Sequence, residues 1–565
     1  SMVTGNKNDT IVFWGCFIVL STTPGKAQTW AWSVKAGGIK SDKASHVRTD
    51  ASGNIYVCGY YNGYATFGSI AVQSNYPTDK HIFVAKYNAS GNIQWVATGG
   101  GMFDDRALGM DVDKAGNIYI TGTFWDQIQF GPFNVTDLSG NTCCDQTFIA
   151  KLSPNGNWIW AKWAGGDWDD HGQDLAVDDF ANVYFTGFYS RAMRFGTIML
   201  PSPPLGDTLL YVAKMDSAGN FLWARHFGGG DGERDNAITV DQNQNVYVAG
   251  GFRGTRTFGT VQMTSVDPPD RDIFVVKYDG QGNFQWARQA GVDKDDRANG
   301  IASDNLGNIY LTGEFKDSAY FGTILLDNYN KRDIFVARMD VAGNWIWAAK
   351  AGGSSGDERG NSIYADRSGR IYVTGSYGHN AFFGSSVFPT GTDSLNIFAA
   401  RISPGGNWLW VATAGGSTSS ERGTDIYPGQ GPDVYVTGHF QQSTKFGSNP
   451  TLISDGKADI FLAKLLDPLL GTEDEFPSFE ANLYPNHFIN HFYLSLNLSK
   501  SETLQIEVLD VSGRNLGEIH RGKFDAGNHL IPLQTENLGL SPGIYFVRIS
   551  VGTKTTLVKL IKAGN

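Results

Sequence analysis

Seven pairs of oppositely charged residues recur along the chain, and carboxylates in such pairs could do acid–base chemistry. Each pair is an Asp or Glu followed directly by Lys, Arg or His. If the protein is an enzyme, Asp105, Asp170 and Glu233 are the carboxylates we would assign as general acid and base. We favour a structural alternative, a ring of charge-assisted bonds joining neighbouring repeats, because seven equal sites suit seven interfaces. The pairs are Asp42-Lys43, Asp105-Arg106, Asp170-His171, Glu233-Arg234, Asp296-Arg297, Glu358-Arg359 and Glu421-Arg422.

The third pair differs most from the others and is therefore the better candidate for a ligand site. It has the only histidine at the basic position, and an additional tryptophan precedes it. Tryptophan beside carboxylates suits a sugar face and its hydroxyl groups, so we expect carbohydrate binding here; an ordinary solvated loop is the alternative. The candidate ligand-binding residues are Phe103, Asp104, Trp125, Asp167, Trp168, Asp169 and His171.

Two acidic runs also suggest calcium. They contain Asp167 with Asp169, and Asp293 with Asp295. Neither completes the Asp-x-Asp-x-Asp-Gly pattern of a calcium loop, so we keep a structural calcium ion only as a secondary hypothesis. No other cofactor is expected, since the sequence has no nucleophile elbow, phosphate loop or zinc spacing.

The elements that position these residues belong to a repeat. Seven near-copies of an Asn-Ile-Tyr-Val-Thr-Gly strand begin at Ile55, Ile118, Val183, Val246, Ile309, Ile371 and Val434, in steps of 62 to 65 residues. So regular a period indicates one structural unit used seven times. In each copy the pattern predicts a hairpin of strands a and b, a segment of about twenty residues containing Phe-Gly, and a hairpin of strands c and d.

The ends of the repeat predict how it closes. The last copy stops after strand c at Lys464, whereas the segment from Thr29 to Gly38 reads as a strand d with nothing before it. We expect this N-terminal strand to complete the last repeat, as in propellers that join their two ends. The predicted fold is an all-β, seven-bladed β-propeller over residues 29–466, with four strands per blade and its aromatic residues packed between blades.

This pattern resembles the SBBP-type β-propeller repeats of exported bacterial proteins. The resemblance is carried by segments such as Ile301-Ala302-Ser303-Asp304, the strand ending at Gly313, and Asp333 to Arg338. It implies a fold and no activity. Because the b–c and d–a segments are the longer ones and emerge on one face, we expect that face to carry any function.

Composition limits the classes of partner and the cellular address. A net charge of -11 argues against nucleic acid, and 13% aromatic residues with 70 glycines fit short strands and tight turns. Residues 1–28 read as a cloning remnant or unusual start followed by a secretory signal peptide, whose ten-residue apolar run from Ile11 is too short to span a bilayer. We therefore expect no transmembrane span in the mature protein. Cys143 and Cys144 form either a vicinal bridge or two free thiols.

A second domain follows a linker at residues 467–480. Residues 481–565 predict a small Ig-like β-sandwich. The segments Leu483-Tyr-Pro-Asn486, Val511-Ser-Gly-Arg514, Pro542 to Arg548 and Lys559 to Lys562 are similar to the type A C-terminal sorting domain of the type IX secretion system of Bacteroidota, with His487 as one departure. The resemblance implies recognition by the type IX translocon, removal by a sorting protease, and a final place outside the cell or on the outer-membrane surface.

Three functions remain open from the sequence. The preferred one is a secreted or surface binding protein that engages polysaccharide or another macromolecule through the loop face. The second is an extracellular polysaccharide hydrolase or lyase that uses the acids named above. The third is a protein-binding scaffold or adhesin.

Overall fold

The computed structural model describes residues 29–140, 144–228, 236–267, 270–292, 294–353, 357–366, 369–378, 380–388, 395–416, 421–467, 481–484, 487–488, 491–498, 501–510, 514–552 and 554–562. The chain divides into two compact units, residues 1–468 and 469–565, and each is described by itself. The proposed signal peptide and most of the proposed linker lie outside the described residues. Within the described part, no helix has the length and apolar character needed to cross a membrane.

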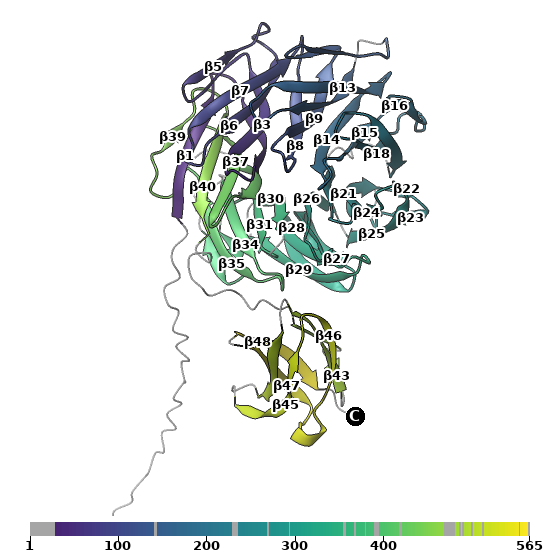
Figure 1. The fold of residues 1–565 in the computed structure, drawn as a ribbon, viewed down its shortest axis with the longest axis vertical. Coiled ribbons are helices and arrows are strands. Elements are labelled where there is room, and N and C mark those ends of the chain that lie inside the picture. Colours follow the sequence, from purple (N-terminus) through teal and green to yellow (C-terminus); the bar gives the residue numbers. More distant parts are fainter. Residues whose placement is uncertain are drawn as a thin grey trace, which may run out of the picture. The chain divides into compact units, whose positions relative to one another are not determined.

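Unit 1 consists of antiparallel four-stranded sets that follow one another around a common centre (Figure 1). We call these sets repeats 1 to 7 and give their strands in the order a, b, c, d. They are β2 (Lys43–Thr49), β3 (Ile55–Asn62), β6 (Lys80–Tyr87), β7 (Ile93–Gly100); β8 (Arg106–Val112), β9 (Ile118–Trp125), β12 (Asp145–Leu152), β13 (Trp158–Gly166); β14 (Asp170–Val177), β15 (Val183–Tyr189), β18 (Leu209–Met215), β19 (Phe221–Phe227); β20 (Asn236–Val240), β21 (Val246–Arg253), β24 (Arg271–Tyr278), β25 (Phe284–Val292); β26 (Arg297–Ser303), β27 (Ile309–Phe321), β28 (Ile324–Met339), β29 (Trp345–Gly352); β30 (Arg359–Ala365), β31 (Ile371–Tyr377), β34 (Asn396–Ile402), β35 (Trp408–Ala414); and β36 (Arg422–Pro428), β37 (Asp433–Phe440), β40 (Asp459–Leu466), β1 (Thr29–Gly37).

The N-terminal strand pairs where the sequence predicts. Strand β1 runs antiparallel to β40, with Thr29 opposite Leu466 and Ala36 opposite Ile460. It therefore supplies strand d of repeat 7, and the first and last repeats are neighbours.

The a–b turns are formed by the recurring Asp-x-x-Gly-Asn sequence. In repeat 1, Asp50 Oδ1 accepts hydrogen bonds from the backbone N–H groups of Ser52 (2.9 Å) and Asn54 (3.0 Å), and Oδ2 accepts from Tyr56 Oη (2.8 Å). Gly53 closes the turn at a φ of +78°, a region that favours glycine. One carboxylate thus fixes the turn and anchors the tyrosine of strand b, which explains why these residue types recur together.

The segment between strands b and c is not a plain connection. It forms a short hairpin, and in five repeats the first strand of this hairpin also pairs with strand d of the preceding repeat, as Phe67 does with Ala36 and Phe130 with Gly99. The hairpins of repeats 4 and 7 form separate two-stranded sheets. The Phe-Gly marks are the turns of these hairpins, and the phenylalanines are buried. The hairpins are β4 (Tyr64–Phe67) with β5 (Ile70–Gln73), β10 (Gln127–Phe130) with β11 (Phe133–Thr136), β16 (Met193–Phe195) with β17 (Ile198–Leu200), β22 (Thr255–Phe258) with β23 (Val261–Thr264), the end of β27 with the start of β28, β32 (Ala381–Phe383) with β33 (Ser386–Phe388), and β38 (Ser443–Thr444) with β39 (Leu452–Ile453).

The core of unit 1 lies between neighbouring repeats. One cluster joins Tyr56 and Val84 of repeat 1 to Ile118, Ile120 and Phe148 of repeat 2, all of them buried. Because each sheet buries its faces against its neighbours, stability comes from stacking the repeats.

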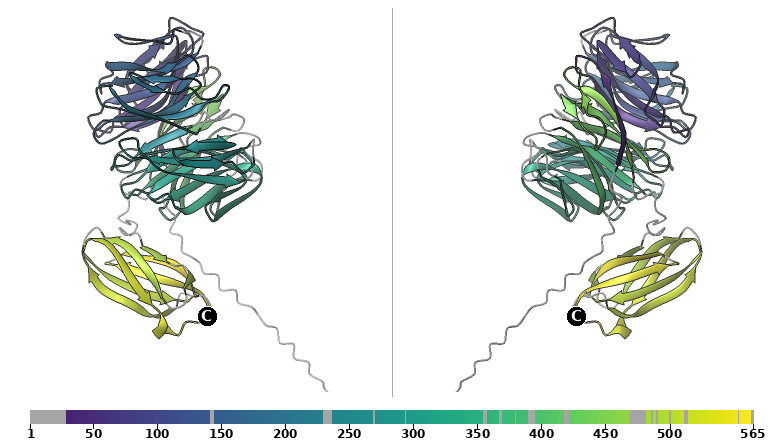
Figure 2. Two further views of the ribbon diagram at one scale, coloured as in Figure 1. Left: turned by 90° about the vertical axis from the view of Figure 1, so that its right-hand side faces the viewer. Right: turned by 90° about the vertical axis from the view of Figure 1, so that its left-hand side faces the viewer.

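Unit 2 contains two sheets that share one core (Figure 2). The core includes Phe492 and Leu494 from the first sheet and Ile506, Val547 and Leu560 from the second. The sequence predicts four of these strands, at residues 492–498, 504–509, 544–549 and 557–561, and does not predict the others. The sheets comprise β41 (Ala481–Tyr484), β43 (His491–Leu498) and β46 (Gly527–Gln534), and β42 (His487–Phe488), β48 (Lys554–Lys562), β47 (Gly543–Val551), β44 (Glu502–Leu509) and β45 (Asn515–Phe524); a 3-10 turn, η2, covers Glu536–Leu538.

Candidate functional site

The innermost strands of unit 1, the a strands, line two cavities that share Arg48. The upper cavity measures about 360 Å³ and lies toward the beginning of these strands, where Arg297, Arg359 and Arg422 contribute to its wall. The lower cavity measures about 260 Å³ and lies toward their ends, beside Asp178. The b–c hairpins and the d–a loops lie at the same end of the strands as the upper cavity.

The side chains that line these cavities break the symmetry of the repeat. The residues five places after the basic residue of each charged pair all line the lower cavity, yet they include one arginine, one aspartate, two tyrosines and three small residues. At this position repeats 1 and 2 contribute charged side chains, repeats 6 and 7 contribute tyrosines, and repeats 3, 4 and 5 contribute small residues. The residues at this position are Arg48, Asp111, Ala176, Thr239, Ala302, Tyr364 and Tyr427.

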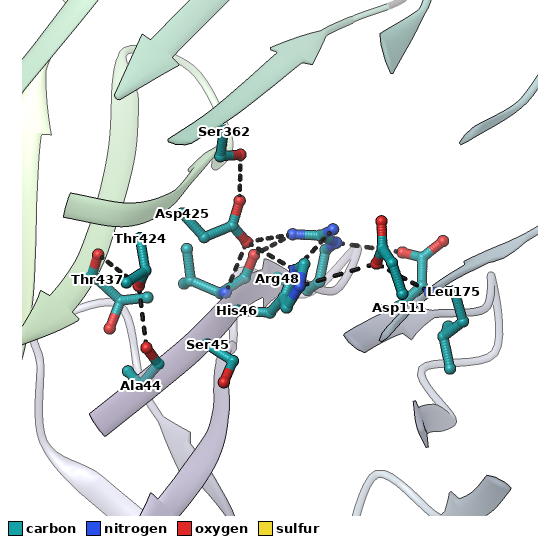
Figure 3. A network of polar contacts seen from close by, with 12 residues as sticks. Ala44, Ser45, His46, Arg48, Asp111, Leu175, Ser362, Thr424, Asp425 and Thr437 are labelled. Carbon is teal, nitrogen blue, oxygen red and sulfur yellow. Dashed lines mark hydrogen bonds and ion pairs between the residues drawn. The ribbon is translucent and has the colours of Figure 1, made fainter. Parts of the chain in front are cut away.

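A network centred on Arg48 lies between the two cavities (Figure 3). Arg48 Nη1 donates to Asp425 Oδ2 at 2.5 Å, and Arg48 Nε lies 3.4 Å from Asp111 Oδ1. The ring of His46 lies 3.3 Å from Asp425 and 3.8 Å from Asp174. These contacts cross from repeat 1 to repeats 7, 2 and 3.

The network has a clear electrostatic pattern. Burial alone raises the pKa of the Asp425 carboxyl, but the positive charge of Arg48 and the contacts with His46 and Ser362 outweigh it and hold that pKa below its usual range. Burial disfavours the charged form of Arg48, and Asp425 and Asp111 reverse this and raise the pKa of its guanidinium. Burial also raises the pKa of Asp111 and of Asp174. The Arg48–Asp425 pair is therefore charged at neutral pH.

The acids of the predicted charged ring form hydrogen bonds with nearby backbone N–H groups. Asp42 Oδ1 accepts from Asn62 N and Oδ2 from Gly38 N, both at 2.7 Å, and Asp105 Oδ2 accepts from Gly101 N at 2.7 Å. We expected bonds that join neighbouring repeats through the basic residues. These acids accept from backbone N–H groups of the d–a loop and the end of strand b, whereas the basic residue Arg359 does reach the preceding repeat, with its Nε 2.9 Å from Glu314 Oε2. Asp42, Asp105, Asp170, Asp296, Glu358 and Glu421 are all buried, and Glu233 and Arg234 lie outside the described residues.

Burial perturbs these acids strongly. It raises the pKa of Asp42 to about 7 and that of Glu358 to about 8, and it raises the pKa values of Asp105, Asp170 and Asp296 well above the usual range. Neighbouring acids add to the shift in all five cases. In three of them the additional acid lies on strand c of the preceding repeat: Asp459 near Asp42, Asp272 near Asp296 and Asp333 near Glu358.

The aromatic residues of the predicted ligand site form an exposed rim at the loop face. The rings of Phe103 and Trp125 lie 5.2 Å apart, and Phe103 is 41% exposed. Phe103 has a φ of +82°, which is unusual for a bulky side chain, and its N–H donates to Asp79 Oδ2 at 3.0 Å. Trp168 is 47% exposed, with the guanidinium of Arg191 4.9 Å from its ring centre.

The polar residues of that predicted site connect the aromatic ones. His171 stacks on Phe188 at 4.3 Å, and its Nε2 lies 3.2 Å from Asp145 Oδ2. Asp145 pairs with Trp125 in the β9–β12 ladder, and its N–H donates to Asp169 Oδ1 at 3.2 Å. Asp104 interacts with Lys80 and, at 3.0 Å, with Arg106, whereas Asp167 is exposed. The structure thus brings Phe103 and Trp125 together, and links Trp125 through Asp145 to His171.

The calcium hypothesis stays a prediction. Asp295 lies within 4.0 Å of Arg253, Arg271 and Arg332, at 3.7, 3.5 and 3.9 Å. Asp293 lies outside the described residues, as does Cys143. The described residues contain no group of three or more His, Cys, Asp or Glu side chains arranged to hold a metal ion.

Sequence reasoning missed the residues between the cavities. Asp425, His46 and Arg48 belong to strands whose repeated features are glycine, alanine and isoleucine. Aligning the seven a strands would have revealed them, since the residue types at the fourth and sixth positions change from repeat to repeat, whereas the fifth position between them is always Val, Met, Leu or Ile.

Comparisons with known proteins agree with this architecture. Residues 482–563 match the family described as a secretion system C-terminal sorting domain, and residues 285–314 and 346–376 match the family described as a beta-propeller repeat. The chain is therefore an all-β protein with SBBP β-propeller repeats. It carries a type IX sorting domain, which directs it to the cell surface or the extracellular space and implies interaction with the secretion machinery.

Two curated relatives are similar over parts of the chain. An uncharacterized WD repeat-containing protein, L264, of Acanthamoeba polyphaga mimivirus is 25% identical over 368 residues, 53% of this chain and 26% of the relative. The regulatory protein FlaEY of Caulobacter vibrioides is 27% identical over 165 residues, 29% of this chain and 17% of the relative. The matches thus span about a quarter or less of either relative.

Solved structures are similar at low identity. A protein of unknown function from Dyadobacter fermentans has a TM-score of 0.34 at 11% identity, with 69% of this chain and 98% of that chain covered. The Pan2 WD40 domain of Neurospora crassa has a TM-score of 0.35 at 8% identity, with 77% and 95% covered.

Proposed function

We propose that residues 29–466 form a seven-bladed β-propeller that binds carbohydrate at its loop face, and that the exported protein acts as a binding protein. Seven a–b–c–d sets and the β1–β40 pairing support the blade number. We also infer an Ig-like sandwich for unit 2, supported by its two sheets and shared core.

The observation that carries the binding proposal is the Phe103–Trp125 pair. An aromatic residue at positive φ is strained by roughly 1–3 kcal/mol, and such strain concentrates at functional sites. Here the Asp79 carboxylate holds the backbone of Phe103 so that its half-exposed ring lies beside Trp125. Rigid aromatic rings with exposed faces give binding area at little entropic cost.

The rim also has polar groups suited to sugar hydroxyls. Trp168 lies under Arg191, and His171 and Asp145 lie between Trp125 and Trp168 in the same part of the loop face. This combination of aromatic faces and hydrogen-bonding groups favours a glycan over an apolar ligand.

Binding is favoured over hydrolysis because of where the candidate catalytic acids lie. Asp105 and Asp170 are 0% exposed, and Asp105 Oδ2 accepts a hydrogen bond from the backbone N–H of Gly101. A general acid must reach the atom that it protonates, within hydrogen-bond distance or through one water. Neither carboxylate offers that reach in this structure.

A glycan array tests the proposal with the purified full chain. We expect binding to at least one glycan class, and a loss of roughly tenfold or more in Phe103→Ala and Trp168→Ala, since each removes contact area worth on the order of 1.4 kcal/mol or more. Phe180→Ala is the matched control, because Phe180 is 68% exposed but lies in an a–b turn at the other end of the strands. An array without binding, or equal binding by Phe103→Ala and wild type, would overturn the proposal.

A further inference from the structure

The upper cavity has an excess of positive charge. Its wall contains four arginines and two histidines but only two carboxylates, those of Asp174 and Asp425. Both carboxylates are engaged by the Arg48 network, where His46 lies within 3.8 Å of each. The other basic side chains of the wall belong to repeats 5, 6 and 7. They are Arg297, Arg359, Arg422 and His439.

Arg422 is the centre of this excess. In the part of the chain that the structure describes, Arg422 forms no ion pair within 4.0 Å, whereas the neighbouring Arg359 has Glu314 at 2.9 Å. Burial, followed by repulsion from Arg359, lowers the pKa of Arg422, although Glu314 and Asp357 act in the opposite direction. Burial, followed by repulsion from Arg422, Lys80 and Arg106, lowers the pKa of Lys43. The cations at the starts of the a strands in repeats 6, 7 and 1 thus repel one another.

His439 adds a neutral hydrogen-bonding group beside Arg422. The two residues are direct partners in the β36–β37 ladder, and both line the cavity. Burial, with Lys43 and Arg422 nearby, lowers the pKa of His439 to about 3, so its ring is neutral at physiological pH. Its Nδ1 atom is buried and has no hydrogen-bond partner among the described residues. A buried polar atom without a partner costs free energy that a ligand group can recover.

We propose that the upper cavity is a binding site for a monosaccharide-sized anion, whose carboxylate or phosphate group is held by Arg422 and Arg359 with His439 as a further partner. Arginine suits both groups because its planar fork can donate two parallel hydrogen bonds. A volume of about 360 Å³ lies at the small end of ligand pockets. Uronic sugars and sugar phosphates share this size and charge.

The site is distinct from the aromatic rim, and the two proposals can fail separately. The rim residues Phe103, Trp125 and Trp168 do not line the cavity. Phe103→Ala should therefore leave anion binding unchanged, while Arg422→Gln should leave neutral glycans bound at the rim.

Isothermal titration of the full chain tests the anion site with D-glucuronate, glucose 6-phosphate and glucose as probes. We expect at least one of the two anions to bind, glucose to bind at least tenfold more weakly, and 0.5 M NaCl to weaken the binding, because salt screens charge–charge attraction. Arg422→Gln should lower the affinity at least tenfold. Arg194→Gln is the control, since it removes the same charge from the exposed side of hairpin β16–β17.

Arg422→Gln should fold normally, because Arg422 forms no ion pair within 4.0 Å in the described part of the chain and is repelled by Arg359. The melting temperature of the variant checks this in the same preparation. Should the variant prove unstable, Lys43→Gln gives a second measurement, with an expected loss of about threefold or more. A short oligogalacturonate tests whether the natural ligand is the end of a polysaccharide chain or a free small anion. Binding as tight as that of D-glucuronate, or tighter, indicates a chain end, and weaker binding indicates a free ligand. Absence of binding by both anions at 10 mM, or unchanged affinity in both variants, would overturn the proposal.

Discussion

Asp467 Oδ1 accepts a hydrogen bond of 2.9 Å from the indole nitrogen of Trp410. In the preceding repeats the equivalent tryptophan donates to a backbone carbonyl in the next c–d turn, as Trp95 does to Pro154 O at 3.2 Å and Trp347 to Pro404 O. Repeat 7 has no c–d turn, since its strand d is the N-terminal β1. The side chain of Asp467 therefore supplies the acceptor that a backbone carbonyl supplies elsewhere, and it also binds Arg401 and Tyr372, each at 2.8 Å.

Asp467→Ala should consequently destabilise unit 1. The substitution leaves the buried Arg401, Tyr372 and Trp410 without this acceptor, and removal of one partner of a buried ion pair costs about 3–5 kcal/mol. Asp340→Ala is the matched control, because Asp340 also follows strand c but bonds only within an exposed turn; we expect a loss of about 1 kcal/mol. Denaturant unfolding measures both, and equal losses would contradict the role given to Asp467.

Arg48 and Asp425 should be energetically coupled. Arg48→Met leaves buried carboxylates without their cation, and Asp425→Asn leaves Arg48 with weaker partners, so each should cost about 3–5 kcal/mol. The double variant should cost less than the sum by about 1–3 kcal/mol, since the two side chains are in direct contact. A double-mutant cycle from urea unfolding tests this, and additivity within about 0.5 kcal/mol would show that the pair is not coupled.

Glu358 should make the stability of unit 1 depend on pH. Burial raises its folded pKa to about 8 from an ordinary value of 4.5, so the folded state holds a proton that the unfolded state releases between these values. This stabilisation is fully present below about pH 4.5 and is lost as the pH rises toward about 8. Glu358→Gln should therefore gain stability relative to wild type between pH 5 and pH 8, by up to a few kcal/mol.

Melting temperatures across that pH range measure the effect of Glu358→Gln. Asp327→Asn serves as the control because the side chain of Asp327 is exposed. A difference between Glu358→Gln and wild type that stays constant from pH 5 to pH 8 would contradict the raised pKa.

Phe103 should be replaceable by glycine with less loss of stability than by alanine. Glycine accepts the positive φ of this position freely, whereas alanine keeps the strain and loses the ring. We expect the free energy of unfolding of Phe103→Gly, measured by chemical denaturation, to be higher than that of Phe103→Ala by roughly 1 kcal/mol. The reverse order would mean that the backbone at residue 103 is not held at positive φ in solution.

Export should depend on the C-terminal residues. Removal of residues 482–563, which match the sorting domain, should retain the protein inside the cell envelope of a host with a type IX system. A fusion of residues 469–565 to an unrelated soluble protein should reach the surface or the medium. Immunoblots of cell fractions decide both, and export of the shortened chain would contradict this assignment.

Much of the architecture could be predicted because local sequence decides it. Two strands joined by a turn of a few residues form a hairpin, and this turn needs Asp, Gly and Asn at fixed positions. Asp50, Gly53 and Asn54 therefore reveal a hairpin whatever the rest of the fold is. The pairing of β1 with β40 followed from a missing strand at one end and a surplus strand at the other. The hairpins within the b–c segments were not recognised, because their strands are only two to four residues long and their pairing partner belongs to another repeat.

The partners of individual side chains could not be predicted in the same way. The charged pairs suggested bonds between repeats, yet Asp42 and Asp105 bond to backbone groups of their own repeats, because the strand a position turns the carboxylate toward the d–a loop. His46 and Asp425 are 379 residues apart in the chain, and no local pattern connects them. They meet because every strand a faces the same central space.

The sequence by itself determined the repeat, its length, strands a to d with the turns that join a to b and c to d, and the C-terminal export domain, since each depends on the order of nearby residues. Only the tertiary structure decided which side chains face the channel together, where the surplus cations of repeats 6, 7 and 1 lie, and which aromatic rings meet at the rim. The physical reason is that these groups interact through space across sheet boundaries, where distance and burial rather than sequence separation set the strength of the interaction.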